Sequence, residues 1–427
     1  MAMKESGIEW VGLIPDTWSV IPNKYVMHKE KNLCEKWTGE DVMSLTMNGV
    51  IVRDLQNPTG KMPATFDGYQ YIEDGDLLMC LFDIDVTPRC VGKVTHDGVT
   101  SPAYSNYKVH DNASRDYFYY YYLMVDNTKE LLHLAKNLRH SFTEEQLGQL
   151  KVPMPPLSEQ QAIADYLDQT CSKIDEIIAE AKASINEYKE LRQGVIFEAV
   201  TKGVNSNVEL KNSGNEWIGM MPSNKRLTKV KYCGNFKKGP FGSAITKDMF
   251  VEKGANTFKV YEQKNAIYSD CTLGYYYISK DKYEELQGFA IQPRDIIVSC
   301  AGTIGKTYVL PDNCEPGIIN QALMRIRLYD KIDRTYFSYL FESLLEYAGK
   351  KYSNGSAIKN IPPFAILNNL WIVDFDVNEQ IEISEYLNIK LPQIDSLISE
   401  KESLINDLEV YKKSLIFEVV TGKRRVV

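Results

Sequence analysis

The chain has 427 residues, of which 44% are hydrophobic and 25% charged, a composition typical of soluble globular proteins and sufficient for two to four domains. No window approaches the roughly 18 apolar residues that cross a bilayer, and the first residues lack the apolar run of a secretory signal, so we expect a cytoplasmic protein without a membrane partner. The net charge of −8 argues, as an average, against a nucleic-acid partner.

Cysteine and histidine usage gives no indication of a metal centre. None of the eight cysteines forms a Cys-x-x-Cys pair, and the five histidines lack paired metal-ligand spacing. We therefore expect buried, reduced thiols and no metal site.

Along the chain, regions rich in short strand patterns and turns alternate with helical regions. The predicted order is strands and turns over 19–157 with a helix near 115–136, a helical region over 158–201, strands and turns over 225–377 with a helix near 333–348, and a helical region over 378–421. Strands and helices segregated in this way predict two tandem α+β domains, each followed by a long helix.

The chain repeats itself. Ser-Gly-Ile-Glu-Trp-Val-Gly at 6–12 returns as Ser-Gly-Asn-Glu-Trp-Ile-Gly at 213–219, and Ile-Phe-Glu-Ala-Val-Thr at 196–201 returns as Ile-Phe-Glu-Val-Val-Thr at 416–421. The offsets indicate a tandem duplication of roughly 210 to 220 residues.

Both helical regions carry apolar residues at seven-residue spacing, the pattern of a coiled-coil seam. Two equal helices in one chain can pair with each other, and an antiparallel pair would give the molecule a pseudo-two-fold axis. In the second helix the stripe is completed either by Leu397, Leu404 and Tyr411 or by Ile398 and Ile405. The predicted seam residues are Ile174, Ile178, Ile185, Tyr188, Ile394, Ile398, Ile405 and Leu408.

Local signals predict where these helices start and break. Ser158-x-x-Gln161 has the pattern of a capping box. Pro392 should break or kink the second helix, and Ser172-x-x-Asp175 lies at the matching point of the first half. We therefore expect a short helix followed by a long one in each half.

Charge is divided unevenly along the chain. Residues 159–200 and 379–420 each hold nine acidic and four basic side chains, a net charge of −5 apiece, which leaves +2 for the remainder. The predicted helices are acidic, whereas the globular regions are slightly basic and able to meet a polyanion.

Gly305-Lys306-Thr307 resembles the end of a nucleotide-binding phosphate loop. Counting back puts Cys300 where the first glycine belongs, and the following Tyr-Val-Leu-Pro is a poor helix start. The duplication instead matches Gly305-Lys306 with Gly92-Lys93 in a repeated strand–turn–strand element. A nucleotide-binding enzyme using this stretch remains an alternative.

Residues 225–238 carry six positive charges and no negative one, and a Gly-Pro-Phe-Gly-Ser turn follows. Such a segment suits contacts to nucleic-acid phosphates, although a solvated basic face explains it equally well. Polar loops near 138–142 and 354–360 offer groups that suit base edges, or are ordinary surface loops. The candidate nucleic-acid contacts are Lys93, Arg139, His140, Ser141, Lys237, Lys238, Gly239, Phe241, Gly242, Ser243, Lys306, Asn320, Gln321, Asn354, Ser356, Lys359 and Asn360.

Three other patterns could indicate a function but are better explained without one. The aromatic run at 117–122 could stack on bases, but its match at 336–339 lies on a predicted helix and favours core packing. Asn-Ile-Pro-Pro-Phe at 360–364 has an inserted residue relative to an amino-methyltransferase motif, and Glu262-x-Lys264 lacks the upstream acidic pair of a nuclease site. The sequence contains no recognisable catalytic site.

These features together resemble the specificity subunits of type I restriction–modification systems. The resemblance rests on the Gly-x-Glu-Trp-x-Gly openings, on Gly-Asp-Leu-Leu at 75–78 and Arg-Asp-Ile-Ile at 294–297, on Pro-Pro-Leu-Ser-Glu-Gln at 155–160, and on the Ile-Phe-Glu-x-Val-Thr helix ends. It covers nearly the whole chain. The second half departs from it, with Asp376-Val377-Asn378 before Glu379-Gln380.

The resemblance implies a non-catalytic chain with two target-recognition domains, each reading half of a bipartite sequence in double-stranded DNA. It implies first and second target-recognition domains over 1–157 and 205–377, and spacer helix regions over 158–204 and 378–427. Two methyltransferase subunits would bind S-adenosylmethionine, and two motor–nuclease subunits would use ATP and Mg, leaving no cofactor for this chain. A coiled-coil structural or adaptor protein without DNA remains a second alternative.

Overall fold

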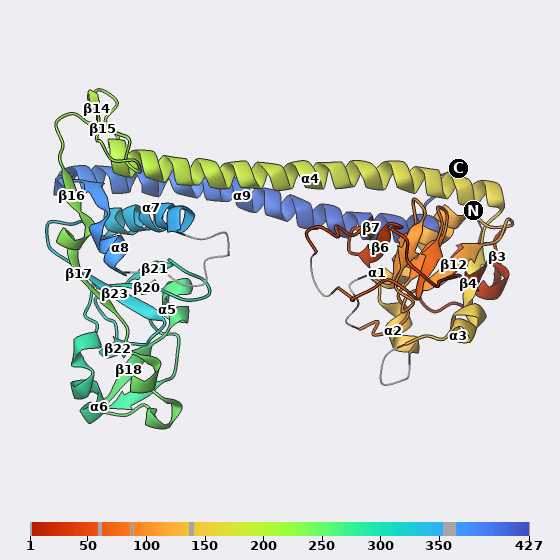
Figure 1. Cartoon of the computed structure of the whole chain (residues 1–427), viewed down its shortest axis with the longest axis horizontal. Helices are drawn as coiled ribbons and strands as arrows, with labels where there is room; N and C mark the ends of the chain where they lie inside the picture. The colour runs from red at the N-terminus through yellow and green to blue at the C-terminus, as the bar shows by residue number, and fades with distance from the viewer. Residues whose placement is uncertain are drawn as a thin grey trace. The chain divides into compact units, whose positions relative to one another are not determined.

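The structure is a computed structural model that describes residues 2–58, 62–85, 87, 89–135, 141–352 and 364–426 (Figure 1). The chain divides into two compact units: unit 1 comprises Met1–Ala183 with Lys401–Val427, and unit 2 comprises Ser184–Glu400. Both divisions fall inside long helices, so each unit holds one segment of each helix. The domain boundaries expected from the sequence stay a prediction.

Unit 1 combines short antiparallel pairs with two larger sheets. The strands are β1 (Met3–Glu5), β2 (Leu13–Pro15), β3 (Ser19–Pro22), β4 (Met27–Glu30), β5 (Leu33–Cys34), β6 (Val42–Thr46), β7 (Gly49–Val52), β8 (Tyr69–Ile72), β9 (Leu77–Met79), β10 (Val91–Lys93), β11 (Gly98–Thr100), β12 (Ser105–Val109) and β13 (Lys151–Met154). The sheets have the orders β1-β2, β3-β13, β10-β9-β12-β4 and β5-β8-β11-β6-β7, and only the β6–β11 pair among these described strands is parallel. The helices outside the long pair are α1 (Arg115–Asn127), α2 (Glu130–Leu134) and α3 (Glu144–Gln149).

Unit 2 repeats this plan. Its strands are β14 (Leu210–Asn212), β15 (Met220–Pro222), β16 (Leu227–Lys229), β17 (Gly234–Lys238), β18 (Thr257–Tyr261), β19 (Tyr277–Ser279), β20 (Ile296–Ser299), β21 (Thr307–Val309), β22 (Gly317–Ile319), β23 (Leu323–Leu328) and β24 (Trp371–Val373). They form the orders β14-β15, β16-β24, β17-β23-β20-β21 and β19-β18-β22, with β18 and β22 parallel. The helices are α5 (Gln263–Ile267), α6 (Lys280–Glu285), α7 (Arg334–Tyr352) and α8 (Phe364–Asn369).

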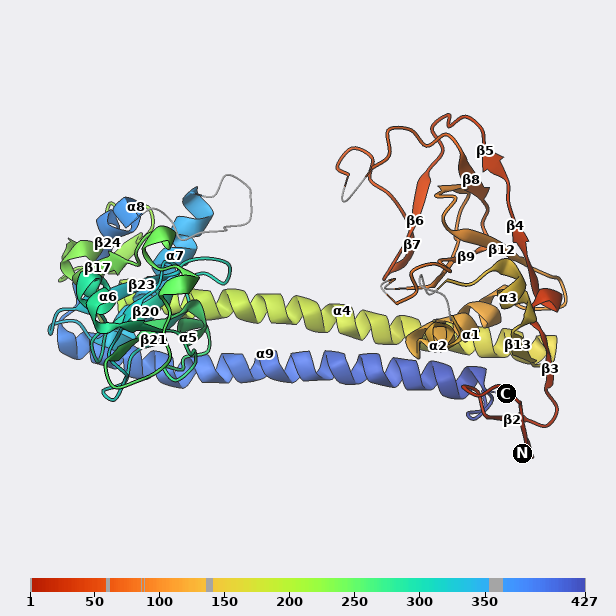
Figure 2. The same cartoon turned by 90° about the horizontal axis from the view of Figure 1, so that it is seen from below.

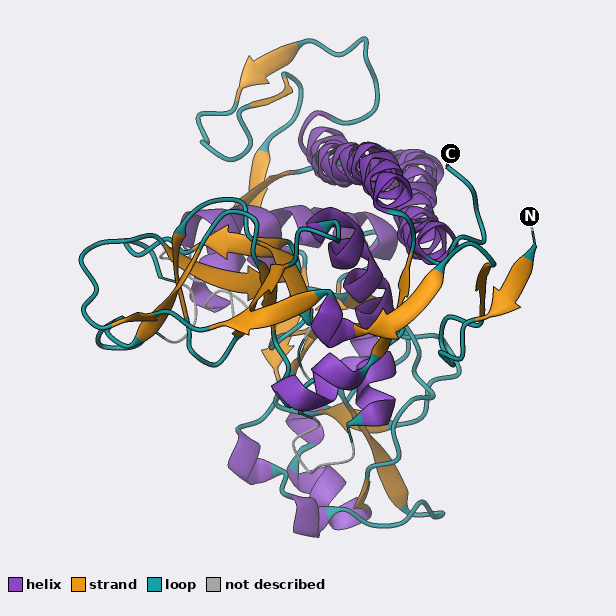
Figure 3. Ribbon diagram, turned by 90° about the vertical axis from the view of Figure 1, so that its right-hand side faces the viewer, coloured by secondary structure: helices purple, strands orange, loops and turns teal. Residues whose placement is uncertain are grey.

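The predicted α+β class and the internal duplication are confirmed. The four-stranded sheet has the same order in both units, since β4, β12, β9 and β10 correspond to β17, β23, β20 and β21. Figure 3 draws the strands in orange and the helices in purple. A fold built twice from matching segments is what a tandem duplication produces.

The aromatic run at 117–122 lies in the core, as its helical match predicted. Tyr117 and Phe118 are fully buried in α1, and the apolar cluster around them includes β9, β10 and both long helices within unit 1. The predicted helix over 115–136 is wrong in one respect, because it divides into α1 and α2. The chain turns at Lys129, which has a positive φ of 55°, and the Lys129 ammonium binds Asp126 Oδ1 at 2.8 Å.

The long helices are α4 (Leu157–Lys202) and α9 (Val377–Val420) (Figure 2). The predicted breaks are wrong, because α4 continues through Ser172 and α9 continues through Pro392. Buried residues flank both points, Cys171 with Ile174 and Leu391 with Ile394, so core packing holds the helix where local preference would end it. The predicted capping box is also absent, because the helix already begins at Leu157.

A buried glutamine anchors the start of each long helix. Gln160 accepts a hydrogen bond from the backbone N–H of Ser114 at 2.8 Å and donates one to the Pro155 carbonyl at 2.8 Å. In unit 2, Gln380 accepts from Asp333 N and donates to Phe375 O, also at 2.8 Å each. The repeated Glu-Gln pair therefore has a structural explanation, because its glutamine joins the long helix to the cap of α1 or α7.

Within each unit a segment of α4 packs against a segment of α9. In unit 1, Ile174 and Ile178 share a core with Leu415 and Val419. In unit 2, Ile196 and Val200 share a core with residues of α9 that include Leu387. Every predicted seam residue is buried or half-buried, whereas the alternative stripe of Leu397, Leu404 and Tyr411 is 38–46% exposed.

One ion pair joins the two long helices in each unit. Lys412 binds Asp175 Oδ1 at 2.7 Å in unit 1, and Arg192 Nε binds Asp395 Oδ1 at 3.0 Å in unit 2. These four residues are repeat equivalents, since Asp175 matches Asp395 and Arg192 matches Lys412. The duplication therefore places the same charge contact in both units, with the roles of the two helices exchanged.

Within the described ranges, no helix combines the length and apolar character that crossing a membrane requires.

Candidate nucleic-acid interface

The stretch that resembles a phosphate loop is a strand–turn–strand element. β20 pairs with β21 in antiparallel fashion, and β9 pairs with β10 in the same way, which confirms the predicted repeat. Thr307–Val309 is a strand, whereas a phosphate loop needs a helix after its lysine. The nucleotide-binding alternative is therefore excluded for this stretch.

The predicted match between the two Gly-Lys pairs is wrong by three residues. Ser299 N donates to Lys306 O at 3.0 Å, and Cys80 N donates to Cys90 O at 2.9 Å, so Lys306 corresponds to Cys90. Lys93 instead pairs with Leu77 of β9. The equivalent pair in unit 2 is Val309 with Ile296. The connection between β9 and β10 is longer than that between β20 and β21, so aligning the two halves by residue identity gave the wrong register.

Three loops converge at one end of the sheets of unit 2. We call them the loop surface: residues 237–243 at the end of β17 and beyond it, 300–306 after β20, and 320–322 before β23. Gly239 N donates to Leu323 O at 2.8 Å, and Cys300 N donates to Ala322 O at 2.8 Å. The predicted contacts Lys237, Lys238, Gly239, Phe241, Gly242, Ser243, Lys306, Asn320 and Gln321 thus come from three separate segments that adjoin in space.

Gly239 is required by this close approach. A Cβ at this position would lie 1.8 Å from the carbonyl oxygen of Asn320, closer than any side chain permits. The side chain of Asn320 meanwhile accepts a hydrogen bond from Ala322 N at 3.0 Å, so it shapes its own turn. Gln321, next to it, is exposed.

The loop surface offers cations and an aromatic ring to solvent. Lys237, Lys238 and Lys306 are exposed, and Phe241 is 89% exposed, the largest fraction among the large apolar side chains that the structure describes. Lys237 lies 5.0 Å from the centroid of the Phe289 ring. Lysines beside an unburied aromatic ring suit a nucleic acid, which has anionic phosphates and flat bases.

A thiol lies beneath these cations. Cys300 is 3% exposed, and burial raises the pKa of its thiol to about 11. The thiol is therefore neutral at physiological pH and does not cancel the charge of the lysines. Gln263 of α5 donates to Ala301 O and supports the same loop from the side.

In unit 1 the predicted contacts are less open. Lys93 Nζ lies 3.0 Å from Asp116 Oδ1 and 3.7 Å from Asp168 Oδ2, so carboxylates already neutralise it. Its contact with DNA stays a prediction, now without geometric support. Ser141 is half-buried. Arg139, His140, Asn354, Ser356, Lys359 and Asn360 lie outside the described residues.

Sequence reasoning missed a basic hollow in unit 1. A space of about 990 Å³ is lined by Arg89, Asn48, Lys182, Lys412 and Lys413, among others, from the β6–β7 turn, the β9–β10 connection and both long helices. Carboxylates of both helices line it as well. The predicted contact Lys93 also lines this hollow. The other cations lie far apart in the sequence, and among them only the adjacent Lys412 and Lys413, in an otherwise acidic helix, gave a signal.

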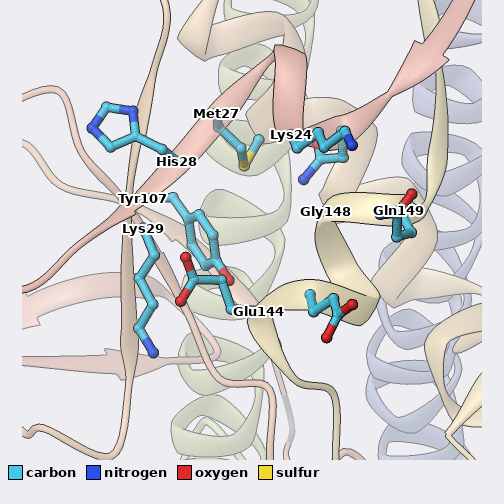
Figure 4. Close-up of a pocket in the computed structure, with 10 residues that line it drawn as sticks. Lys24, Met27, His28, Lys29, Tyr107, Glu144, Gly148 and Gln149 are labelled. Carbon is cyan, nitrogen blue, oxygen red and sulfur yellow. The ribbon is translucent and has the colours of Figure 1, made fainter.

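A smaller hollow of about 210 Å³ lies between β4 and α3 in unit 1 (Figure 4). Tyr107 lies between Met27 and Glu144 in this view, and its buried hydroxyl has no hydrogen-bond partner in the part of the chain that the structure describes. Burial raises the pKa of Tyr107, and the charge of Glu144 raises it further. The lining mixes ammonium, imidazole and carboxylate groups, and this mixture indicates no class of cofactor.

Metal-ligand chemistry is likewise not indicated. Among the residues with described positions, no group of three or more His, Cys, Asp or Glu side chains is arranged to hold a metal ion. Glu262 and Lys264 bind each other at 2.9 Å, and Glu262 caps α5. The Glu-x-Lys pattern therefore has a local structural role.

The fold and the loop surface define a duplicated α+β protein whose units are each built on paired segments of two long helices. Residues 89–187 match the family model of the type I restriction modification DNA specificity domain. The chain is 27% identical over 286 residues to the type I restriction enzyme MjaVIII specificity subunit of Methanocaldococcus jannaschii, covering 65% of this chain and 63% of that relative. It is 25% identical over 324 residues to the putative MjaX specificity subunit of the same organism, covering 74% and 69%.

Solved structures share the fold. A chain from a study of complex assembly and conformational transition of the type I R-M system matches with a TM-score of 0.70 and 14% identity, covering 96% of this chain and 99% of that one. The HsdS subunit from Thermoanaerobacter tengcongensis matches with a TM-score of 0.52 and 15% identity, covering 96% and 98%. The expected resemblance to the specificity subunits of type I restriction–modification systems is confirmed.

Proposed function

We propose that this chain is the non-catalytic subunit that selects the DNA target of a type I restriction–modification complex in the prokaryotic cytoplasm. Each unit reads one half of a bipartite sequence in double-stranded DNA. The observation that carries the proposal is the match of residues 89–187 to the DNA specificity domain, in a fold that occurs twice in the chain.

The loop surface of unit 2 supports this proposal. Lys237, Lys238 and Lys306 offer charge for phosphates, while Gln321 offers an amide for base edges. The net charge of −8 is no obstacle, because the segments 159–200 and 379–420 of the long helices carry −10 in total and the rest of the chain carries +2.

We also propose that the long helices bind the other subunits. Apolar side chains at heptad spacing remain exposed on both helices: Ile177 and Leu191 of α4 are 44% and 51% exposed, and Leu397 and Tyr411 of α9 are 40% and 46% exposed. Ile177 is the repeat equivalent of Leu397, and Leu191 that of Tyr411. Two equivalent apolar stripes suit two copies of one partner.

The proposed partners are two methyltransferase subunits and two motor–nuclease subunits. We assign S-adenosylmethionine, ATP and Mg to those subunits, as the resemblance implies. An adaptor protein without DNA contact is the remaining alternative.

Filter binding of the chain together with its methyltransferase partner to random-sequence duplex DNA tests the proposal. We expect retention that falls steeply between 50 and 200 mM salt, on the order of 10³-fold or more for a protein with six or more phosphate contacts. Methylome mapping of a host that expresses the complex should then reveal a bipartite motif. Absence of salt-sensitive retention would leave the adaptor alternative as the better account.

A further inference from the structure

Unit 2 contains an open pocket of about 550 Å³ between α4, α7 and the repeated Gly-Asn-Glu-Trp-Ile-Gly segment at 214–219. We call it the aromatic pocket, because Phe197, Trp217 and Tyr347 line it. The Trp217 ring centroid lies 5.4 Å from that of Phe197 and 5.6 Å from that of Tyr347. The indole N–H donates to Trp371 O at 2.7 Å, so it is satisfied within unit 2.

Carboxylates surround these rings. Glu190, Glu216 and Glu346 all line the aromatic pocket. Lys350 binds Glu346 at 2.7 Å, and the charge of Glu190 also acts on the Lys350 ammonium, although Glu190 forms no ion pair with any residue in the described ranges. The pocket therefore keeps an unbalanced negative charge next to aromatic rings, a combination that attracts cations.

One ammonium group of the chain itself already binds to two of the residues that line the pocket. Lys351 binds the Glu216 carboxylate, lies 5.4 Å from the centroid of the Tyr347 ring, and donates to the Tyr347 hydroxyl at 2.9 Å. Lys351 itself does not line the pocket. It shows that an ammonium is bound here by a ring and a carboxylate together.

One hydrogen-bond acceptor in the lining is unused. Gln193 donates to Glu342 Oε1 at 3.2 Å through its Nε2, but its buried Oε1 accepts no hydrogen bond from the described part of the chain. A buried acceptor without a donor is costly, and because this oxygen is shielded from solvent, a donor from outside reaches it only when the Gln193 side chain turns toward the pocket. Arginine and lysine side chains carry several such donors.

Gly194 leaves open space on this face of α4. Glycine is unfavourable in the middle of a helix, yet a Cβ at Gly194 would meet no atom within 4 Å. The contacts within this chain therefore do not require a glycine here. A glycine that lines a pocket without being needed for internal packing leaves room for an outside group.

We propose that the aromatic pocket receives an arginine or lysine side chain of the partner methyltransferase subunit. The inference rests on the proposed function and deepens it, because it assigns one docking point on the chain. The rings contact the cation, and Glu190 supplies the opposite charge. Gln193 Oε1 accepts one of the cation's hydrogen bonds once its side chain turns toward the pocket. DNA does not suit the pocket, because Glu190 would repel phosphates, and an apolar side chain would leave Gln193 Oε1 without a donor.

Two matched pairs of variants test the proposal in complexes of the full chain with the methyltransferase subunit. Gly194→Gln fills the pocket, whereas Asn186→Gln puts the same side chain at an exposed position of α4 that does not line it. Glu190→Gln removes the unpaired charge, whereas Glu187→Gln removes an exposed charge outside the pocket. We expect about tenfold weaker binding for Gly194→Gln, about threefold weaker for Glu190→Gln, and no change for either control.

A probe without the partner tests the chemistry of the pocket. The full chain is labelled with 5-fluorotryptophan, the Trp217 resonance is assigned with Trp217→Phe, and N-acetylarginine methylamide is compared with its neutral citrulline analogue. We expect the arginine compound alone to shift the Trp217 resonance, and Gly194→Gln to abolish the shift. Gly194→Ala should raise the melting temperature of the chain and still weaken methyltransferase binding, a combination that a purely structural glycine would not give.

The outcomes separate this inference from the proposed function. If the unaltered chain does not bind the methyltransferase subunit, the proposed role of the long helices is overturned, and the inference with it. Normal binding by the unaltered chain together with undiminished binding by Gly194→Gln would overturn the inference alone. Equal shifts with arginine and citrulline compounds, or a shift with duplex DNA, would also overturn it.

Discussion

Replacing the buried Gln160 with methionine should destabilise unit 1 strongly, because two hydrogen bonds to backbone groups depend on its amide. Gln160 is fully buried, accepts from Ser114 N and donates to Pro155 O, each at 2.8 Å. Methionine has a similar length but replaces neither bond. A buried backbone group without a partner costs about 1–3 kcal/mol, so two such groups together cost about 2–6 kcal/mol.

The neighbouring Gln161 is the matched control. It is exposed, and its amide binds only Asp165 of the same helix at 2.9 Å, so Gln161→Met should change stability by less than about 0.5 kcal/mol. Urea unfolding followed by far-UV circular dichroism measures both variants. Gln380→Met should match Gln160→Met, because Gln380 makes the equivalent bonds in unit 2. A loss below about 1 kcal/mol for Gln160→Met would refute the proposed anchoring.

Three further predictions concern the DNA surface, the buried thiol and the helices. Replacing Lys237 and Lys238 with alanine should reduce the slope of log affinity against log salt by about 1.8, measured by filter binding, whereas an unchanged slope would show that neither lysine meets a phosphate. Because the folded-state pKa of Cys300 is about 11, above its unfolded value, the unfolded chain loses this proton first as pH rises. Stability should therefore fall between about pH 9 and 11, by up to 2–3 kcal/mol from this group, and Cys300→Ala should flatten the fall in urea titrations. Under the proposed function, inserting one heptad in both long helices, at 183/184 and 400/401, should lengthen them by about 10.5 Å and change half-site spacing by about three base pairs; altered half-site sequences in methylation mapping would contradict this.

Periodicity and repetition predicted the elements that depend on burial. The α+β class, the duplication and the long helices follow from apolar residues at regular spacing, and α4 begins and ends within one residue of its predicted bounds. The break predicted at Pro392 failed because a helix end depends on tertiary packing as well as on local preference. Leu387 and Leu391 are buried in unit 2 before the proline, and Ile394 is buried after it.

The candidate site was predicted only where its residues are neighbours in the sequence. Lys237 to Ser243 form one basic, glycine-containing segment that can be recognised directly. The hydrogen bond from Cys300 N to Ala322 O joins the other two loops to each other, and the bond from Gly239 N to Leu323 O ties the basic segment to β23. Neither bond leaves a sequence signal. Lys93 was predicted as a DNA contact, and no pattern in the sequence pairs its charge with a carboxylate. In the fold two carboxylates, one from α1 and one from α4, lie next to its ammonium group.

The exchanged ion pairs explain how a duplicated chain keeps two equivalent cores. Asp175 of α4 binds Lys412 of α9 in unit 1, while in unit 2 Asp395 of α9 binds Arg192 of α4. Each contact joins a residue of one repeat to a residue of the other, so neither repeat completes a core alone. A substitution in a long helix therefore affects the stability of the unit in which that part of the helix packs, which can be the unit built mainly from the other repeat. The C-terminal residues Leu415 to Val420 accordingly pack in the same core as Ile8 and Trp18 near the start of the chain, so changes to α9 beyond Lys401 should affect unit 1 and leave the loop surface of unit 2 intact.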